Sequence, residues 1–246
     1  MQTTLFISDL HLCNERPEKL TLFKKLLRGP ARRADALYIL GDLFEAWAGD
    51  DDNTPPHPEI ISELAEYTAS GACLYIMRGN RDYLLGRDFA VKSGGLLIND
   101  PATIELGGKK TLLMHGDTLC TKDIKYQIYR RIVNNLIAIR LFLVIPFFLR
   151  VKIWHGIRNI TRKTTLNKSP YIIDVHQPAV EQAMLQHGVS ELIHGHTHKQ
   201  AIHEFILNGQ MARRFVLGDW YARDCVLVSD VRGLRMMRVQ DYLNSG

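Results

Sequence analysis

The chain has 246 residues and a formal net charge of +5, with 46% hydrophobic and 23% charged residues. These values are typical of a folded globular protein and exclude an intrinsically disordered chain. The length allows one large α/β domain, with or without an insertion. The four cysteines stand far apart with no C-x-x-C pair. Their spacing argues against a disulfide framework or a cysteine zinc site and suits a reducing compartment.

The sequence predicts neither a secretory leader nor a transmembrane helix. A strand-like stretch at residues 3–7 follows Met1 almost at once, so we expect no secretory leader. The longest apolar run, from Leu141 to Leu149, has nine residues and contains Pro146. A run of this length is too short to cross a bilayer. We therefore expect a cytoplasmic protein.

Polar side chains follow short apolar runs at five places along the chain. The runs are typical of buried strands, and they lead to Asp9 and His11, Asp42, Asn80, His115, and His196 with His198. We expect helices at residues 17–28, 58–70 and 179–187, and closing strands at 215–217 and 226–228. Strands that alternate with helices predict a sheet with helices on both faces. In such sheets the polar residues beyond the strand ends lie close together.

The segment from about residue 124 to 173 interrupts this alternation. It contains ten Lys or Arg and no Asp or Glu, which gives it a charge of +10 and leaves −5 for the rest of the chain. Such asymmetry indicates an anionic partner with a local docking site. We expect two or three helices here, with breaks at Pro146 and Gly156. We interpret the segment as a helical cap inserted into a single domain of residues 1–246.

The polar residues after the five runs are of the types that bind metals. Asp9 and His11 stand two residues apart, so both point to the same side of an extended chain, and the later histidine pair repeats this spacing. The seven residues offer enough donors for two divalent cations about 3.5–4 Å apart. Nitrogen and oxygen donors without sulfur favour Mn²⁺, Fe²⁺ or Zn²⁺ over Ca²⁺. Each motif alone is explained equally well by a capping or surface residue, but five in this order argue against chance.

The order Asp-x-His, Gly-Asp, Gly-Asn, His and Gly-His-x-His resembles the calcineurin-like metallophosphoesterase family. The resemblance implies an α/β fold, a four-layer sandwich with the helical cap inserted, that holds two metal ions. It implies that Asp9, His11 and His198 bind one ion and that Asn80, His115 and His196 bind the other, with Asp42 as the bridge. It also implies catalytic roles for Asp42, Asn80, His115 and His196.

The third motif departs from the family pattern, because Arg81 stands where the family usually has histidine. An arginine is no general acid at neutral pH, but it can hold a phosphate oxygen with two parallel hydrogen bonds. With this change, the stretches around the five motifs closely resemble one branch of the family, the UDP-2,3-diacylglucosamine diphosphatases of lipid A biosynthesis. The matching stretches are residues 6–12, 38–47, 79–86, 114–120 and 192–198.

The resemblance to this branch implies a substrate, a cofactor and a location. It implies Mn²⁺-dependent hydrolysis of UDP-2,3-diacylglucosamine to UMP and 2,3-diacylglucosamine 1-phosphate, at the cytoplasmic face of the inner membrane, by a peripherally attached protein. The basic residues of the insert would face the anionic membrane surface. The residues expected to contact the substrate are Asn80, Arg81, Asp123, Tyr126, Thr161, Thr165, Lys168 and His196. The apolar residues of the insert would surround the acyl chains: Leu136, Ile137, Leu141, Phe142, Phe147, Phe148, Ile153 and Trp154.

Three alternatives stay open at this point. The first is that the insert is an ordinary amphipathic subdomain, and the second is that the chain is a nuclease or cyclic-nucleotide phosphodiesterase of the same family. The third alternative is a non-catalytic scaffold, although no expected ligand is missing. The density of Leu, Ile and Phe in the insert argues against nucleic acid as a partner, and we infer no obligate protein partner. We expect Asp50 to Asp52 to form a solvated loop, Asp117 to orient His115 or a nearby backbone group, and His194 to support a ligand from behind.

Overall fold

The computed structural model describes residues 3–166, 172, 174–221 and 224–244 and contains two β-sheets. The first sheet has the strand order β11-β10-β1-β2-β3-β4, and the second has the order β5-β6-β7-β9-β8. The strands of the first sheet are β1 (Thr4–Ile7), β2 (Ala36–Leu40), β3 (Cys73–Met77), β4 (Leu96–Ile98), β10 (Cys225–Asp230) and β11 (Gly233–Arg238). Those of the second are β5 (Ala102–Leu106), β6 (Lys109–Met114), β7 (Glu191–His194), β8 (Ala201–Leu207) and β9 (Gln210–Val216).

Each sheet has a parallel centre and antiparallel edges. Strands β1 to β4 run parallel, and β10 joins β1 antiparallel. In the second sheet β6, β7 and β9 run parallel, while β5 and β8 pair antiparallel at the two edges. The parallel strands therefore end on the same side within each sheet, which is where their following loops meet.

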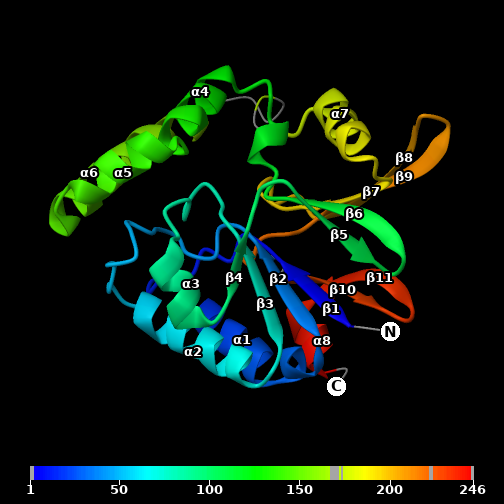
Figure 1. Ribbon diagram of the computed structural model, residues 1–246, viewed down its shortest axis with the longest axis horizontal. Coiled ribbons are helices and arrows are strands. Elements are labelled where there is room, and N and C mark those ends of the chain that lie inside the picture. The colour runs from blue at the N-terminus through cyan, green and yellow to red at the C-terminus, as the bar shows by residue number, and fades with distance from the viewer. Residues whose placement is uncertain (1–2, 167–171, 173, 222–223, 245–246) are drawn as a thin grey trace.

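Apart from the helices of the basic segment, the described helices lie on the outer faces of the two sheets (Figure 1). Those packed on the first sheet are α1 (Pro17–Arg28), α2 (His57–Ala69), α3 (Arg87–Ser93) and α8 (Val239–Asn244), with the short turn η1 (Pro30–Arg33) after α1. The second sheet carries α7 (Gln177–His187), and η2 (Asp117–Leu119) follows β6. The predicted helices at 17–28, 58–70 and 179–187 are confirmed, the last two with starts one or two residues earlier.

Side-chain alternation along the strands builds three separate cores. In β1, Leu5 and Ile7 pack toward the helices, whereas Phe6 lies between the sheets with Leu113 and Ile193. Neighbouring residues of β6 and β7 pack instead against α7. This period of two places apolar side chains on both faces of each strand. The four-layer sandwich implied by the family resemblance is confirmed, and the expectation of one sheet with helices on both faces is wrong.

The basic segment forms three helices, α4 (Ile124–Val133), α5 (Leu136–Val144) and α6 (Phe147–Leu166). They lie together beyond the loop that follows β2 (Figure 1). Pro146 separates α5 from α6 as predicted, but Gly156 does not break α6, because a helix tolerates one glycine at a cost of about 1 kcal/mol. Among the described residues, no helix is long and apolar enough to cross a membrane.

Candidate metal centre

All seven predicted metal ligands lie at the edge where the parallel strands of both sheets end. Residues after β1, β2 and β3 come from the first sheet, and residues after β6 and β7 come from the second. An unbroken series of contacts of 2.9 to 3.8 Å joins them. In the order of these contacts the residues are Asp9, His198, His11, Asp42, His115, Asn80 and His196.

The backbone at this edge is held in an uncommon conformation. Asp9, His11, Asp42, His196 and His198 all have positive φ angles, between 49° and 70°. Non-glycine residues seldom adopt this region, although Asp and His do so more often than most. Such strain persists only where the surroundings impose it, and it is concentrated at functional sites.

Two glycines make the close approach of the loops feasible. A Cβ atom at Gly79 would lie 2.1 Å from Asp42 Oδ1, and one at Gly195 would lie 2.3 Å from Asp9 Oδ2. Only a residue without a side chain fits at either position. The Gly-Asn and Gly-His motifs therefore have a steric cause: each glycine lets one loop pass directly over a carboxylate of another.

The first group of candidate ligands consists of Asp9, His11 and His198. Asp9 Oδ2 accepts hydrogen bonds from the Ser8 hydroxyl at 2.6 Å and from the His196 backbone N–H at 2.8 Å. Its Oδ1 is buried without a hydrogen-bond partner and lies 3.4 Å from His198 Nε2. One oxygen is thus fixed and the other is left to bind a cation. Donor atoms of the three residues lie within 4.8 Å of one another, which suits one divalent ion.

The second group centres on Asn80, whose Oδ1 lies 3.1 Å from His115 Nε2 and 2.9 Å from His196 Nδ1. The other nitrogen of His115, Nδ1, lies 2.9 Å from the Leu40 carbonyl oxygen. When the ring is neutral, donation from Nδ1 to that carbonyl leaves Nε2 as the nitrogen with a free lone pair. The group offers two imidazoles and one amide oxygen, a donor set that suits a transition-metal ion.

Asp42 lies between the two groups. Its Oδ2 is 3.7 Å from His11 Nε2, and its Oδ1 is 3.8 Å from His115 Nε2. Burial raises the pKa of Asp42 to about 7, with Asp82 and Asp9 adding to the rise against the charges of His115 and Arg81. A buried carboxylate with one oxygen toward each group is suited to bridging two cations. Asp9 also lies within 4.8 Å of Asp42 and His115, so it too faces both groups.

The histidines differ in how readily they carry a proton. Burial works against protonation of both His115 and His198, but neighbouring carboxylates outweigh it and raise the pKa values to about 9 and about 10. For His115 these are Asp42 and Asp9, and for His198 they are Asp219 and Asp9. Burial, assisted by the charge of His115, lowers the pKa of His196 to about 4.

Three carboxylates around the site were not predicted from the sequence. Asp219 Oδ2 lies 3.0 Å from His198 Nδ1, and Glu45 Oε2 lies 3.4 Å from His11 Nδ1. Asp82 is buried and accepts hydrogen bonds from three backbone N–H groups, those of Leu43, Phe44 and Gly79. It ties the loop after β2 to the loop after β3. The only sequence signal was the placement of Glu45 and Asp82 a few residues after two of the motifs.

A cavity of about 650 Å³ adjoins the metal-ligand candidates, and residues of the insert form part of its wall. Arg81, Asp123 and Tyr126, three of the predicted substrate contacts, line it together with Asn80 and His196. The Tyr126 ring stacks on His196, with ring centroids 6.0 Å apart. The side chain of Asp123 also caps α4 by accepting a hydrogen bond from the Tyr126 N–H at 3.1 Å.

The remaining predicted substrate contacts lie wholly or partly outside the described part of the chain. Thr161 and Thr165 belong to α6, but their side chains lie outside the described part of the chain, as does the whole of Lys168.

Two residues close to the candidate ligands in sequence, Asp117 and His194, make contacts other than those expected. Asp117 does not contact His115 but accepts hydrogen bonds from the Tyr126 hydroxyl at 2.7 Å and from Arg130 Nε at 2.5 Å, so it anchors α4. His194 is buried and bonds only to the adjacent Gly195 carbonyl among the described residues, so it supports no ligand through its own ring.

The expected solvated loop at residues 50–52 is instead structural. Asp50 accepts hydrogen bonds from three backbone N–H groups at the start of α3, and Asp51 forms an ion pair with Arg150 of the insert. Asp52 is buried and lies 3.4 Å from His57 Nδ1. Each of these three consecutive aspartates therefore makes a specific contact with another part of the chain.

Comparison with known proteins agrees with this geometry. The model of the calcineurin-like phosphoesterase family matches residues 3–200. A UDP-2,3-diacylglucosamine hydrolase of Pseudomonas putida KT2440 is 47% identical over 232 residues, which cover 94% of this chain and 97% of that protein. One of Escherichia fergusonii is 50% identical over 218 residues, or 89% of this chain and 91% of that protein. The chain belongs to the calcineurin-like phosphoesterase family and is a metal-dependent hydrolase.

Proposed function

We propose that this protein hydrolyses the pyrophosphate bond of UDP-2,3-diacylglucosamine to UMP and 2,3-diacylglucosamine 1-phosphate, using two Mn²⁺ ions. The proposal rests on one observation above all: a single cavity is lined both by the metal-ligand candidates and by aromatic and aliphatic residues of the insert, among them Tyr129, Phe142 and Ile157. A substrate with a charged pyrophosphate and an apolar end needs both kinds of wall. The names of the similar proteins support the same substrate.

In this proposal the two groups of ligands each hold one ion and Asp42 links them. The bound cations supply positive charge that stabilises the charge developing on the phosphoryl oxygens. The protein's own contribution is orientation. The Arg81 backbone N–H donates to Asp42 Oδ1 at 2.8 Å. This hydrogen bond holds the Arg81 backbone beside the two groups of candidate ligands. The Arg81 side chain lines the cavity, and its guanidinium clamps a phosphate oxygen of the substrate.

The apolar residues of the insert divide into two sets in the structure. Phe142 and Trp154 line the cavity, where they would pack on the acyl chains. Leu136, Ile137, Leu141, Val144 and Phe148 are exposed, and each leaves at least 61% of its surface in solvent. An exposed apolar patch of this kind marks an interaction site.

The basic residues divide in the same way. Arg130, Arg150 and Arg158 form ion pairs with carboxylates of the main body, so they do not serve as headgroup contacts. Lys125, Arg131, Arg140 and Lys152 are exposed. We propose that they and the exposed apolar set dock the protein peripherally on an anionic membrane surface, the cytoplasmic face of the inner membrane.

The proposal is tested by following UDP-2,3-diacylglucosamine hydrolysis with phosphorus-31 NMR, with and without Mn²⁺. We expect signals of UMP and a sugar 1-phosphate, only when the metal is present. Isotopic water fixes the bond that breaks, because attack at the phosphorus next to uridine places the label in UMP. Label in the sugar phosphate would contradict the proposed attack. Turnover of DNA, RNA or a cyclic nucleotide, with none of the lipid, would favour the nuclease or phosphodiesterase alternative.

A further inference from the structure

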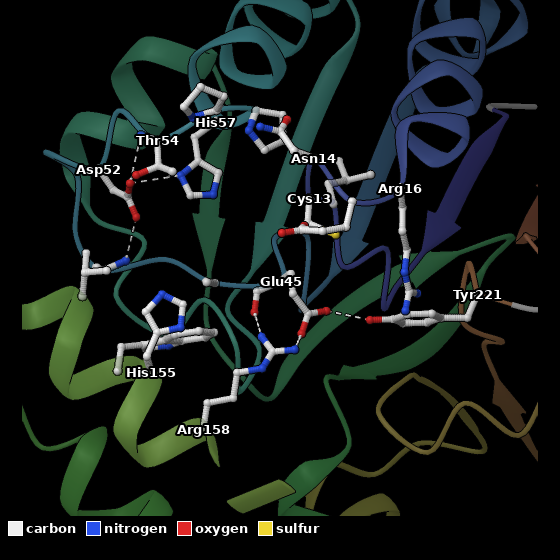
Figure 2. Close-up of a pocket in the computed structure, with 18 residues that line it drawn as sticks. Cys13, Asn14, Arg16, Glu45, Asp52, Thr54, His57, His155, Arg158 and Tyr221 are labelled. Atoms are coloured by element: carbon white, nitrogen blue, oxygen red, sulfur yellow. Dashed lines mark hydrogen bonds and ion pairs between the residues drawn. The ribbon is translucent and has the colours of Figure 1, made fainter. Parts of the chain in front are cut away.

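A second cavity, of about 520 Å³, adjoins the one beside the metal-ligand candidates. Five residues line both cavities and so mark the boundary between them: Arg16, Glu45, Trp154, Arg158 and Tyr221. Figure 2 shows this second cavity, with Asp52, Thr54 and His57 on one side and Arg16 and Tyr221 on the other. None of the roles assigned above uses its interior.

Glu45 stands at the centre of the boundary (Figure 2). Its carboxylate accepts a hydrogen bond from the Tyr221 hydroxyl at 2.6 Å and forms an ion pair with Arg158. Nη1 of Arg158 also donates to the Glu45 carbonyl oxygen at 3.1 Å. The negative charge at the boundary is therefore already matched by a cation of the insert.

Of the two cations at this boundary, Arg16 forms no ion pair with a carboxylate of the described residues. Its guanidinium carbon lies 3.6 Å from the centre of the Tyr221 ring. Among the residues that the structure describes, no carboxylate forms an ion pair or hydrogen bond with its side chain. At this distance from Tyr221 the guanidinium makes a cation–π contact with the ring. Its planar fork of N–H groups suits two oxygens of one phosphate.

The cavity beside the metal groups has two different ends. At one end Tyr221 lies beside His11 and His198, with ring centroids 5.2 and 6.1 Å apart. At the other end Tyr126 stacks on His196, and Asp123 lies nearby. Of the proposed substrate contacts, Asp123, Tyr126 and His196 belong to this end. A pyrophosphate that spans the two metal groups must then direct its other substituent toward Tyr221 and Arg16.

We propose that the second cavity is a nucleoside subsite, which takes the uridine half of the substrate, and that Arg16 holds the phosphate of the departing UMP. This inference rests on the proposed function. His155, which lines only this cavity, supplies an aromatic face on which a base can stack. The side-chain amide of Asn14, which has no hydrogen-bond partner among the described residues, offers a donor and an acceptor to the edge of the base.

The experiment compares the affinities of the two products for the metal-loaded enzyme. Equilibrium dialysis with radiolabelled UMP measures one, and inhibition of hydrolysis by 2,3-diacylglucosamine 1-phosphate measures the other. Arg16→Ala should weaken UMP binding about ten-fold or more, the loss expected for a charge-assisted hydrogen-bonded pair, and change inhibition by the lipid product less than two-fold. Arg16→Lys keeps the charge without the planar fork and should lie between. Arg81→Ala is the matched control, for which the pattern should reverse.

A second pair of ligands separates the base from the phosphate. Asn14→Ala should weaken binding of uridine and UMP equally, whereas Arg16→Ala should weaken only UMP. If folded Arg16→Ala and Asn14→Ala bind both ligands as the unchanged protein does, the subsite assignment is wrong even though the enzyme cleaves the lipid. Absence of UMP binding at millimolar concentration by an active enzyme would overturn it as well. Failure to cleave UDP-2,3-diacylglucosamine at all would instead overturn the proposed function.

Discussion

Two histidines of the candidate metal centre share one arrangement, in which the nitrogen pointing away from the cluster has an oxygen partner. For His115 the partner is the Leu40 carbonyl at 2.9 Å, and for His198 it is Asp219 at 3.0 Å. Such partners fix the tautomer and the ring orientation of a metal ligand and raise its basicity. His11 Nδ1 lies 3.4 Å from Glu45 and forms no hydrogen bond among the described residues. The orientation of the His115 and His198 rings is therefore set before any ion arrives.

The Asp219 partner yields a direct prediction. Asp219→Asn removes the charge beside His198 but keeps the size of the side chain, so metal affinity should fall about 10- to 100-fold while the fold is kept. Metal titration monitored by calorimetry measures the change. Asp174→Asn is the matched control, because Asp174 pairs with the exposed Lys199 and touches no candidate ligand. Equal affinities for the two variants would show that Asp219 does not support the site.

Proton release on metal binding is a second residue-scale prediction. In the metal-free protein the pKa values of about 9 for His115 and about 10 for His198 keep both rings protonated at pH 8, while Asp42, with a pKa of about 7, is mostly ionised. A metal ion must displace these protons, so about two should be released per chain at pH 8. Affinity should accordingly rise with pH and level off above the higher pKa. Calorimetry in buffers of different ionisation enthalpy counts the protons, and a count near zero would contradict the ligand assignment.

The candidate ligands could be picked out from the sequence because each follows a short apolar run, and their partners could not. Asp219 comes after β9 with no motif around it, and its relation to His198 depends on how the loops pack. Asp117 shows the opposite error: it adjoins a ligand in sequence, yet its side chain turns to Arg130. Sequence proximity indicates where a backbone goes, and the partner of a buried carboxylate is decided by three-dimensional packing.

At the scale of elements, the insert is attached to the main body by buried polar contacts. Arg150 is 2% exposed, forms an ion pair with Asp51 and donates to the carbonyl oxygens of Ala48 and Ile145. The composition of the insert predicted two or three helices with breaks at Pro146 and Gly156, and the structure has three helices and only the first of these breaks. The composition did not predict which basic residues would form ion pairs with the main body. An arginine at a helix surface has the same sequence pattern whether it faces water or a carboxylate.

The exposed apolar set of the insert gives the prediction at this scale. The triple variant Leu141→Ser, Val144→Ser and Phe148→Ser should lose most binding to vesicles that contain anionic lipid, because apolar burial and headgroup attraction act together. Its melting temperature should change little, since all three side chains are at least 61% exposed. Vesicle sedimentation measures the binding.

The β8–β9 hairpin supplies the control for this prediction. Ile202, Ile206 and Met211 are also exposed large apolar residues, between 49% and 63%, but they lie outside the insert. Their replacement by serine should leave vesicle binding unchanged. Loss of binding in both triple variants would mean that the protein adheres through general surface hydrophobicity, and loss in neither would refute docking through the insert.

Over the whole molecule, the site depends on two sheets that the alternation of strands and helices did not distinguish. The strands β5, β8 and β11 are antiparallel edge strands, and their partly polar sequences lack the buried runs that marked β1, β2 and β3. The four-layer arrangement came from the family resemblance rather than from periodicity. Once the two sheets face each other, their strand ends meet at one edge, and seven residues from distant parts of the chain become neighbours.

Because the ligands come from both sheets, bound metal should join the two halves of the sandwich. Asp9, His11 and Asp42 follow strands of the first sheet, while His115 and His198 follow strands of the second. A ligand that binds only the folded state, at 100 times its dissociation constant, stabilises that state by about 2.7 kcal/mol. For a chain of this size each kcal/mol corresponds to roughly 2–4 °C. Removal of metal with a chelator should therefore lower the melting temperature by about 5–10 °C, and added Mn²⁺ should restore it.

The variant His198→Ala separates this linkage from nonspecific effects of the chelator. Its first ligand group is incomplete, so its melting temperature should respond to Mn²⁺ much less than that of the unchanged protein. Differential scanning calorimetry at several free Mn²⁺ concentrations should show the melting temperature of the unchanged protein rising with the logarithm of the concentration, as linkage requires. A melting temperature independent of Mn²⁺ in the unchanged protein would mean that the two sheets are not joined by metal, whatever the geometry of the seven side chains.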